Sequence, residues 1–508
     1  MPIELTLHWQ GRPTRCGRAA ILDRLTPLTP RYELAPGGRH TRTATYLDTV
    51  DWRLRRRGLV LRHVAGSLVL DGEGGPWRTE LPKEPSWPVL ADGLAPGEVR
   101  DEVSRAMWVR AIAPKLRART LSREVTVRDA EGRTVAEVVW AESAGVEPVE
   151  TEPLTHVTVR SPRKRDGERV AQILLTGAEF LPGEARVYDE LLTASGLPEE
   201  RLKPEIAADT PADAAIARAL LGFADTIDAN VEGTIDDIDT EFLHELRVAV
   251  RRTRSLLKIA GDVLPEPAPK GFKWVGALTT PTRDLDVYLL SLPGFARDIT
   301  VGGPADLEPF QAHLVWERAR ERRKLVAGLR SKKFRKLLDR WRASLREVAE
   351  AGESPVTAAE LATDRLHHVA ADVLAQAAAI TPDSPAEHVH TLRKRCKELR
   401  YALEVFRPLC EPEPYKKVLK NLKRLQDVLG AFQDGEVQSE HLRLYAERML
   451  HREDPPAATL LAMGELLSRF IRQQHEARHA LGEALEKFLG DKTRDQLDAL
   501  LPAASCIS

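Results

Sequence analysis

The strongest constraint on the fold is a motif of four basic side chains at helical spacing that occurs twice. It occupies residues 244–254 and 390–400, and both copies follow the pattern His-x-x-Arg-x-x-x-Arg/Lys-x-x-Arg. An α-helix turns about 100° per residue, so these four positions fall within an arc of about 80°. Each segment is therefore predicted to be a helix that carries one longitudinal stripe of cations. Such a stripe is usually a solvated helix face, but its recurrence in register favours a binding surface.

The similarity between the two halves of this region extends beyond the stripes. Residues 273–287 align without gaps to residues 423–437. A repeat of this kind is typical of two similar helical bundles packed together. We therefore predict an internal repeat of residues 207–352 and 353–500, which forms two similar helical bundles related by a pseudo-twofold axis.

The length of the chain and the alternating, turn-separated pattern of its first 205 residues predict at least one further domain before this repeat. A chain of 508 residues is too long for one hydrophobic core. Residues 1–205 contain short alternating segments separated by turns, with a hairpin over 124–140, and helices are expected near 14–25, 99–113, 168–176 and 184–195. This predicts an α+β fold in which an N-terminal antiparallel, barrel-like β domain is followed by an all-α domain at 207–500.

Helix signals follow one another from about residue 207 onward. The expected helices lie near 211–231, 240–261, 269–291, 306–350 (with a break near Ser331), 355–380, 385–408, 413–431, 434–452 and 457–490. Charge is concentrated in this region. Residues 390–424 contain 11 Lys/Arg against 4 Asp/Glu, and residues 316–342 contain 12 against 3. A chain of net charge −1 with segments this basic has segregated its charge, which focuses a positive field on a polyanion.

Several classes of protein are disfavoured by what the sequence lacks. The four cysteines form no Cys-x-x-Cys pair, which argues against a disulfide framework and a structural zinc site. Neither a Gly-rich phosphate loop nor a His/Asp metal spacing is present, so no cofactor and no metal are predicted. There is no leader segment and no long apolar run. We expect a cytoplasmic protein that does not enter the membrane.

The paired motifs, together with Arg283-Asp284-Leu-Asp286 and the segment Leu422–Gly430, resemble the CHAD domain. The resemblance covers about residues 207–500. It implies an all-helical duplication of two four-helix bundles that binds inorganic polyphosphate through basic residues near the shared axis, and an association with polyphosphate granules. The residues that match, extend or flank the family's basic positions are His244, Arg247, Arg251, Arg254, Lys258, Lys273, His390, Arg393, Lys397, Arg400, Lys416, Lys420 and Lys423.

The N-terminal part resembles the CYTH, or triphosphate tunnel, family. The resemblance covers about residues 1–205 and rests on the segments 45–62 and 77–82 and on the hairpin 123–140. Tunnel triphosphatases hold Mg²⁺ or Mn²⁺ with a cluster of carboxylates. Most of these positions are replaced here, by Thr6, His156, Thr158 and Ala141, so we expect no metal-dependent hydrolysis. The cations that remain predict at most a residual anion pocket, formed by Arg62, Arg123 and Lys203.

Three functional classes stay open at this point: a polyphosphate-binding module, a triphosphatase or polyphosphatase in the N-terminal domain, and a nucleic-acid-binding scaffold. Polyphosphate is favoured because guanidinium and ammonium groups on rigid helices suit a polyanion. Nucleic acid is disfavoured because Tyr401 is the lone aromatic candidate for base stacking in the stripes. His244 and His390 either contact phosphate or cap or pack at helix starts, and for Arg62 and Arg123 the interpretation as ion-paired strand residues is favoured over a phosphate-binding role. Oligomeric state stays undetermined.

Overall fold

The computed structural model describes residues 2–11, 17–81, 85–176, 179–183, 187–197, 206–264, 270–300, 302–452 and 454–500. The chain divides into two compact units, Met1–Arg201 and Leu202–Ser508. This division lies close to the predicted boundary between residues 205 and 207. Lys203, one of the predicted pocket residues, lies outside the described residues.

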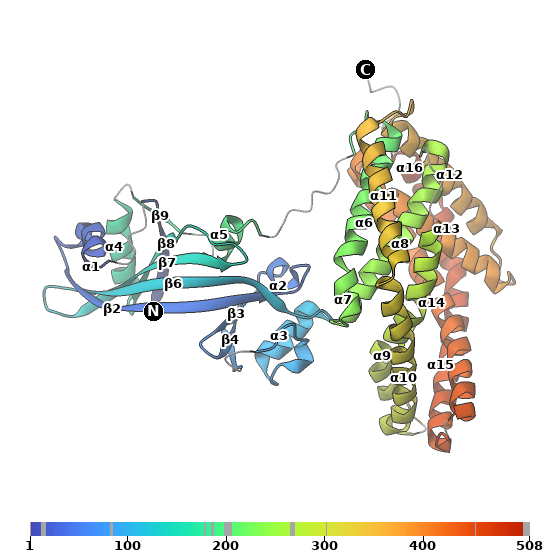
Figure 1. Ribbon diagram of the computed structural model, residues 1–508, viewed down its shortest axis with the longest axis horizontal. Helices are drawn as coiled ribbons and strands as arrows, with labels where there is room; N and C mark the ends of the chain where they lie inside the picture. Colours follow the sequence, from blue (N-terminus) through green and yellow to red (C-terminus); the bar gives the residue numbers. More distant parts are fainter. Residues whose placement is uncertain are drawn as a thin grey trace. The chain divides into compact units, whose positions relative to one another are not determined.

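The N-terminal unit is an antiparallel sheet flanked by helices (Figure 1). Among the described residues the strands follow the order β5-β4-β3-β2-β6-β7-β8-β1-β9. No pairing joins β5 to β9 in the described ranges, so closure into a barrel stays a prediction. The strands are β1 (Ile3–Trp9), β2 (Glu33–Asp48), β3 (Val60–Val64), β4 (Ser67–Asp71), β5 (Trp77–Glu80), β6 (Ala113–Arg128), β7 (Thr134–Glu147), β8 (Leu154–Ser161) and β9 (Phe180–Pro182).

Helices cover this sheet where its apolar side chains gather. Trp140 of β7 is fully buried in a core to which α1 and α4 contribute Ile21 and Val170. A second core joins β3 and β4 to α2 and α3, and α5 packs its Leu191 and Leu192 on β6. The helices are α1 (Arg18–Arg24), α2 (Arg53–Arg56), α3 (Glu98–Met107), α4 (Lys164–Leu175) and α5 (Val187–Ala194).

The sequence analysis missed the long strand β2. Its 16 residues include Pro36, two glycines and several exposed polar side chains, so the alternation expected of a half-buried strand is weak. Pairing with β6 over almost its whole length compensates for this weak local signal. The predicted antiparallel α+β unit and the hairpin of β6 and β7 are confirmed.

The second unit is all-helical, as predicted (Figure 1). Its main core draws on helices from α6 through α15, and a smaller aromatic core joins the ends of α9, α10, α14 and α15. The helices are α6 (Ala212–Ala229), α7 (Val231–Ile235), α8 (Thr240–Ala260), α9 (Gly271–Arg297), α10 (Glu308–Leu329), α11 (Lys332–Ala351), α12 (Ala358–Ala379), α13 (Ala386–Val405), α14 (Pro412–Arg452), α15 (Ala457–Leu489) and α16 (Asp491–Asp498). None of the described helices is long and apolar enough to cross a membrane.

One predicted helix boundary is confirmed and another is wrong. The break near Ser331 separates α10 from α11, and the Ser331 hydroxyl caps α11 by accepting from the backbone N–H of Phe334 at 3.2 Å. The two helices predicted over 413–431 and 434–452 are instead the single helix α14. Gly435 continues the helix because α15 packs against it closely: an added Cβ would lie 2.8 Å from the carbonyl oxygen of Phe470.

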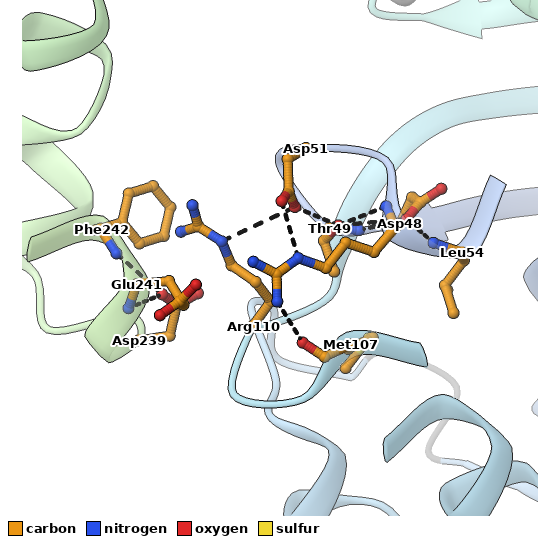
Figure 2. Close-up of polar contacts among 10 residues, drawn as sticks. Asp48, Thr49, Asp51, Leu54, Met107, Arg110, Asp239, Glu241 and Phe242 are labelled. Atoms are coloured by element: carbon orange, nitrogen blue, oxygen red, sulfur yellow. Dashed lines mark hydrogen bonds and ion pairs between the residues drawn. The ribbon is translucent and has the colours of Figure 1, made fainter. Parts of the chain in front are cut away.

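Carboxylates fix local backbone turns in both units, as Figure 2 shows. In the N-terminal unit, Asp48 accepts from the backbone N–H groups of Thr49 and Leu54, at 2.7 and 2.9 Å. In the helical unit, Asp239 caps α8 by accepting from the N–H groups of Glu241 and Phe242. A cap of this kind satisfies backbone donors that have no partner within the helix. The cap therefore fixes where α8, and with it the first stripe, begins.

Candidate anion-binding site

The two predicted stripes lie on α8 and α13, which run side by side in the helical unit (Figure 1). Leu246 and Val250 of α8, and Leu392 and Leu399 of α13, are buried in the main core. Residues three or four positions apart share a helix face. Burying these leucines and valines therefore turns the basic positions of both helices away from the core.

The stripes meet around Tyr401 of α13. The guanidinium carbon of Arg251, on α8, lies 5.8 Å from the centre of the Tyr401 ring, and that of Arg400 lies 5.3 Å from it. The ring itself is only 3% exposed. An aromatic face attracts cations at this range. Cations from the two helices therefore converge on one ring, and Arg400 is in addition paired with Glu404 at 3.6 Å.

The pKa of Lys397 indicates that the region around it is strongly positive. Burial, together with the neighbouring cations Arg393, Arg251 and Arg400, lowers the pKa of the Lys397 ammonium to about 8. Arg251 belongs to α8 and the other two cations belong to α13, so both stripes act on the same ammonium group. Like charges disfavour the charged form of a neighbour, as does burial. The two stripes therefore form one cationic cluster.

The first stripe is also fixed against α9. Arg247 donates from Nη1 to the hydroxyls of Thr280 and Thr279, at 2.7 and 3.2 Å. Arg254 reaches the same helix at Gly276, where an added Cβ would lie 3.3 Å from its Nη1. Neutral hydroxyl acceptors hold Arg247 in place without cancelling its charge. The sequence analysis did not identify the threonines or Gly276 as part of the site, although both lie within the repeated segment 273–287.

Corresponding residues of the two halves make corresponding contacts. Arg393 lies 3.7 Å from Asp434 across α13 and α14. In the first half, Asp284 is close enough to Arg247 to favour its charged form, and the alignment pairs these residues with Asp434 and Arg393. His390 bonds to Gln433, which the alignment pairs with Arg283. These contacts agree with an internal repeat; the twofold axis itself stays a prediction.

The two histidines that open the motifs do not cap their helices. Asp239 caps α8, and α13 begins at Pro385 without a side-chain cap. His390 contacts Gln433 instead, and burial together with nearby Arg283 lowers the pKa of His244. Both are half-buried between helices, so packing describes their position. Their contact with phosphate stays a prediction.

The predicted flanking lysines differ in their surroundings. Lys273, Lys416, Lys420 and Lys423 are all exposed. Helices α8 and α9 run antiparallel, and Arg247 of α8 contacts Thr280 of α9. Lys273, seven residues before Thr280, therefore lies near the level of Arg254, seven residues after Arg247. By the same reasoning, the bond from Gln426 to the carbonyl oxygen of Cys396 places Lys423 near the level of Arg400.

Four of the predicted cations are paired with acids. Besides Arg393 with Asp434, Arg400 Nε lies 3.6 Å from Glu404 Oε1. Lys258 Nζ lies 2.7 Å from Glu398 Oε1 of α13, and Lys416 Nζ lies 2.8 Å from Glu413 Oε1. Both lysine side chains are more than half exposed. Ion pairs at exposed positions are weak, but they reduce the charge offered to a ligand. Lys258 therefore marks the end of the unpaired part of the first stripe.

The residual anion pocket predicted in the N-terminal unit is not assembled. Arg62 is paired with Asp71 at 3.0 Å, and Arg123 donates to the carbonyl oxygen of Gly37 at 2.6 Å. Arg62 lies opposite Tyr46 of β2, whereas Arg123 lies opposite Arg39. Seven residues of extended strand separate these two partners, a distance of roughly 23 Å. The reading of Arg62 as an ion-paired strand residue is the one that its contacts support.

Two other cavities are present in the N-terminal unit. The larger, about 1180 Å³, is lined by His63, Lys115, Arg117 and Glu147 among others, and Arg117 is paired with Glu147 at 3.2 Å. The smaller, about 620 Å³, is lined by Glu4, Glu137 and Arg160, and Arg160 lies 3.3 Å from Glu4. In the described ranges no group of three or more His, Cys, Asp or Glu side chains is arranged to hold a metal ion.

Comparison with known proteins bears on the helical part of the chain. Residues 218–443 match the family model of the CHAD domain, in agreement with the resemblance found in the sequence. Among solved structures, the CHAD domain from the plant Ricinus communis is 27% identical, with a TM-score of 0.49, over 55% of this chain and 93% of that one. PptA from Streptomyces chartreusis is 18% identical, with a TM-score of 0.43, over 55% of this chain and 100% of that one.

Further solved structures match a smaller share of the chain. The Hippeastrum adenylyl cyclase candidate HpAC1, described by a dominant triphosphatase activity, is 14% identical, with a TM-score of 0.25, over 39% of this chain and 99% of that one. No curated protein matches the chain.

Proposed function

We propose that the helical unit of this chain binds inorganic polyphosphate through the paired stripes of α8 and α13. The observation that carries the proposal is the gathering of Arg251, Arg400 and Lys397 around one aromatic ring, with cations from both helices acting on Lys397. Such crowding destabilises the unliganded protein. A ligand with one negative charge at every phosphate supplies the missing counter-charges.

The chemistry of the side chains fits phosphate oxygens. Guanidinium groups donate hydrogen bonds in a planar fork, and each hydrogen bond between charged groups contributes about 1.5–3 kcal/mol. Arg247 is already oriented by Thr279 and Thr280. Because rigid helices hold the cations in place before the ligand arrives, little side-chain entropy is lost on binding. Affinity for long chains is also the basis for expecting association with polyphosphate granules.

The alternative ligand, single-stranded nucleic acid, is disfavoured by the position of Tyr401. Non-specific binding of single strands relies on aromatic rings that stack on successive bases. Tyr401 is 3% exposed and has cations near it, so a base has no access to its face. The alternative enzymatic function is disfavoured because Arg160 lies against Glu4 in the smaller cavity of the N-terminal unit.

Calorimetric titration with long-chain polyphosphate tests the proposal. The double variant Arg251→Glu/Lys397→Glu should lose measurable binding and keep the helicity of the wild type. The control Arg335→Glu/Arg346→Glu reverses two exposed charges of α11 on the flank that faces α6, and should bind like the wild type. Unchanged affinity in the first variant, with unaltered circular dichroism, would remove the stripes from the mechanism. Duplex DNA and heparin titrations show whether the site prefers polyphosphate.

A further inference from the structure

A second row of cations continues from the first stripe across the outside of the helical unit. Lys333, Lys336 and Arg340 on α11 are spaced by three and four residues, so they share one flank of that helix. Lys270, just before α9, and Lys273 within it lie one turn apart. All five side chains are exposed, and none of them forms an ion pair within the described part of the chain. We call these five residues the lateral basic row.

Contacts between α9 and α11 hold this row together. Lys333 Nζ lies 4.1 Å from the centre of the Trp274 ring, directly after Lys273 in the chain. Gly271 packs so closely on Leu337 that an added Cβ would lie 2.7 Å from a methyl carbon of that leucine. The rings of Phe272 and Trp341 meet edge to face at 5.8 Å. The start of α9 is therefore fixed beside the first turns of α11.

Lys273 connects the row to the central stripes. It shares a face of α9 with Gly276 and Thr280, the positions reached by Arg254 and Arg247. Trp274, the next residue, faces Lys333. The cations of α8 and those of α11 therefore lie on either side of one turn of α9, with Lys273 between them.

The two flanks of α11 differ in charge. On the flank facing α6, Arg342 is paired with Asp225 and Asp228, at 2.9 and 3.2 Å. Both acids lie in the last two turns of α6. On the flank facing α9, Lys333, Lys336 and Arg340 form no ion pair with a described residue, and the exposed acid Glu347 follows about two turns further along the same helix. An ordinary solvated helix face would carry mixed charge, so this asymmetry indicates a surface for a polyanion.

We propose that the lateral basic row is an extension of the polyphosphate site that engages only chains longer than the central stripes can hold. This rests on the proposed function of those stripes and adds a preference for chain length. Lys333 to Arg340 spans about 10 Å along α11, comparable to the span from Arg247 to Arg254. A flexible chain leaving the central cluster at Arg254 would pass Lys273 and reach Lys333.

The test compares two variants of the same helix. Lys333→Gln/Lys336→Gln neutralises two cations of the lateral basic row. Arg335→Gln/Arg346→Gln neutralises two exposed cations on the α6 flank. For long-chain polyphosphate, the first variant should bind about fivefold more weakly than the wild type, with a shallower salt dependence. The control should change affinity by less than about twofold. For tripolyphosphate, both variants should match the wild type.

The outcomes separate this inference from the proposed function. Equal long-chain affinity in both α11 variants overturns the lateral row and leaves the stripes untouched, provided that Arg251→Glu/Lys397→Glu still abolishes binding. A loss of tripolyphosphate affinity in Lys333→Gln/Lys336→Gln also overturns it, since the row would then act on the central site. If the wild type binds no polyphosphate at all, both proposals fail. A fluorescence change on long-chain binding that Trp274→Phe removes would support displacement of Lys333 from that ring.

Discussion

The two units of this protein treat their cations in opposite ways. In the N-terminal unit, Arg62, Arg117 and Arg160 are each paired with a carboxylate on the same sheet, at 3.0 to 3.3 Å. In the helical unit, Arg251 and Arg254 have no carboxylate partner among the described residues, and Lys397 is surrounded by like charges. Carboxylates therefore offset the charge of these arginines in the first unit, whereas Arg251 and Arg254 in the second unit keep a charge that no described carboxylate offsets.

The difference follows from the geometry of the two kinds of element. Neighbouring strands place residues opposite one another, so an arginine in one strand meets an acid in the next, as Arg160 meets Glu4. Helix stripes place residues of one kind along a single line. In α13 the acid Glu404 ends the line of Arg393, Lys397 and Arg400, and Glu398 lies beside that line. Glu398 pairs with Lys258 of α8, and Glu404 pairs with both Arg252 of α8 and Arg400, whereas Arg251 has no carboxylate partner in the described ranges.

The largest expected difference in polyphosphate affinity is between two variants, each of which neutralises three cations in one of the two units. Arg251→Gln/Arg254→Gln/Lys397→Gln should weaken long-chain polyphosphate binding by at least about 100-fold, since each lost charged hydrogen bond costs about 1.5–3 kcal/mol. The matched variant Arg62→Gln/Arg117→Gln/Arg160→Gln should change the affinity by less than about threefold. Calorimetry on both variants measures the contrast. Similar losses in the two would show that charge pairing does not predict the binding site.

A smaller effect is expected from pH. The pKa of Lys397 in the folded protein is about 8, below the usual value of a lysine, so the ammonium loses its proton as pH rises through that value. Because a polyanion favours the protonated form, affinity should fall by up to about tenfold between about pH 7 and about pH 9, and binding near pH 8 should take up a proton.

The replacement Lys397→Arg isolates this group, because arginine stays charged throughout the range. Its polyphosphate affinity should be nearly constant over the same pH interval. Proton uptake is measured by repeating the titration in buffers of different ionisation enthalpy. A wild-type affinity that is flat with pH, or a Lys397→Arg variant that keeps the slope, would assign the titration to another group.

The same residue affects stability in a direction that the sign of the shift determines. A lysine whose pKa is depressed by folding binds fewer protons in the folded state than in the unfolded state between about pH 8 and about pH 10.4. The free energy of unfolding should therefore rise with pH across that window. Lys397→Met should raise the free energy of unfolding near pH 7, on the order of 1 kcal/mol, and flatten this dependence. Urea denaturation at several pH values measures both.

Sequence periodicity was sufficient to predict the helices of the second unit and the faces that carry the stripes, because spacings of three and four residues fix a helix face. The domain boundary and the break at Ser331 were equally readable from local signals. The long strand β2 was not, since its fit depends on pairing with β6 and not on its own alternation. The continuation of α14 through Gly435 depends on close packing with Phe470. Which cations are paired, as Lys258 is with Glu398, depends on contacts between helices that no spacing within one helix encodes.

That pairing predicts a small effect for a residue in the stripe itself. Lys258→Gln should weaken polyphosphate binding by no more than about twofold, because Glu398 already offsets its charge. Arg254→Gln, one turn earlier and without a carboxylate partner in the described ranges, should cost about tenfold. Equal losses in the two variants would mean that the ligand displaces Glu398. In that case Glu398→Gln should strengthen binding, which the same titration would detect.

The smallest effect is expected from the carboxylates of the N-terminal unit. Glu4 and Glu137 line one cavity, but Arg160 lies on the strand between them and 3.3 Å from Glu4. Metal-assisted phosphoryl chemistry needs several carboxylates to hold the cations against the phosphate chain. Thr6 and Thr158, which lie opposite one another on β1 and β8, contribute neutral hydroxyls and no carboxylate. Phosphate release from tripolyphosphate with Mg²⁺ or Mn²⁺ should therefore stay at background.

Glu4→Ala and Glu137→Ala should match the control Glu131→Ala, which alters an exposed turn. Robust release that either cavity variant abolishes, and the control retains, would give the N-terminal unit a catalytic role and reverse the contrast between the two units.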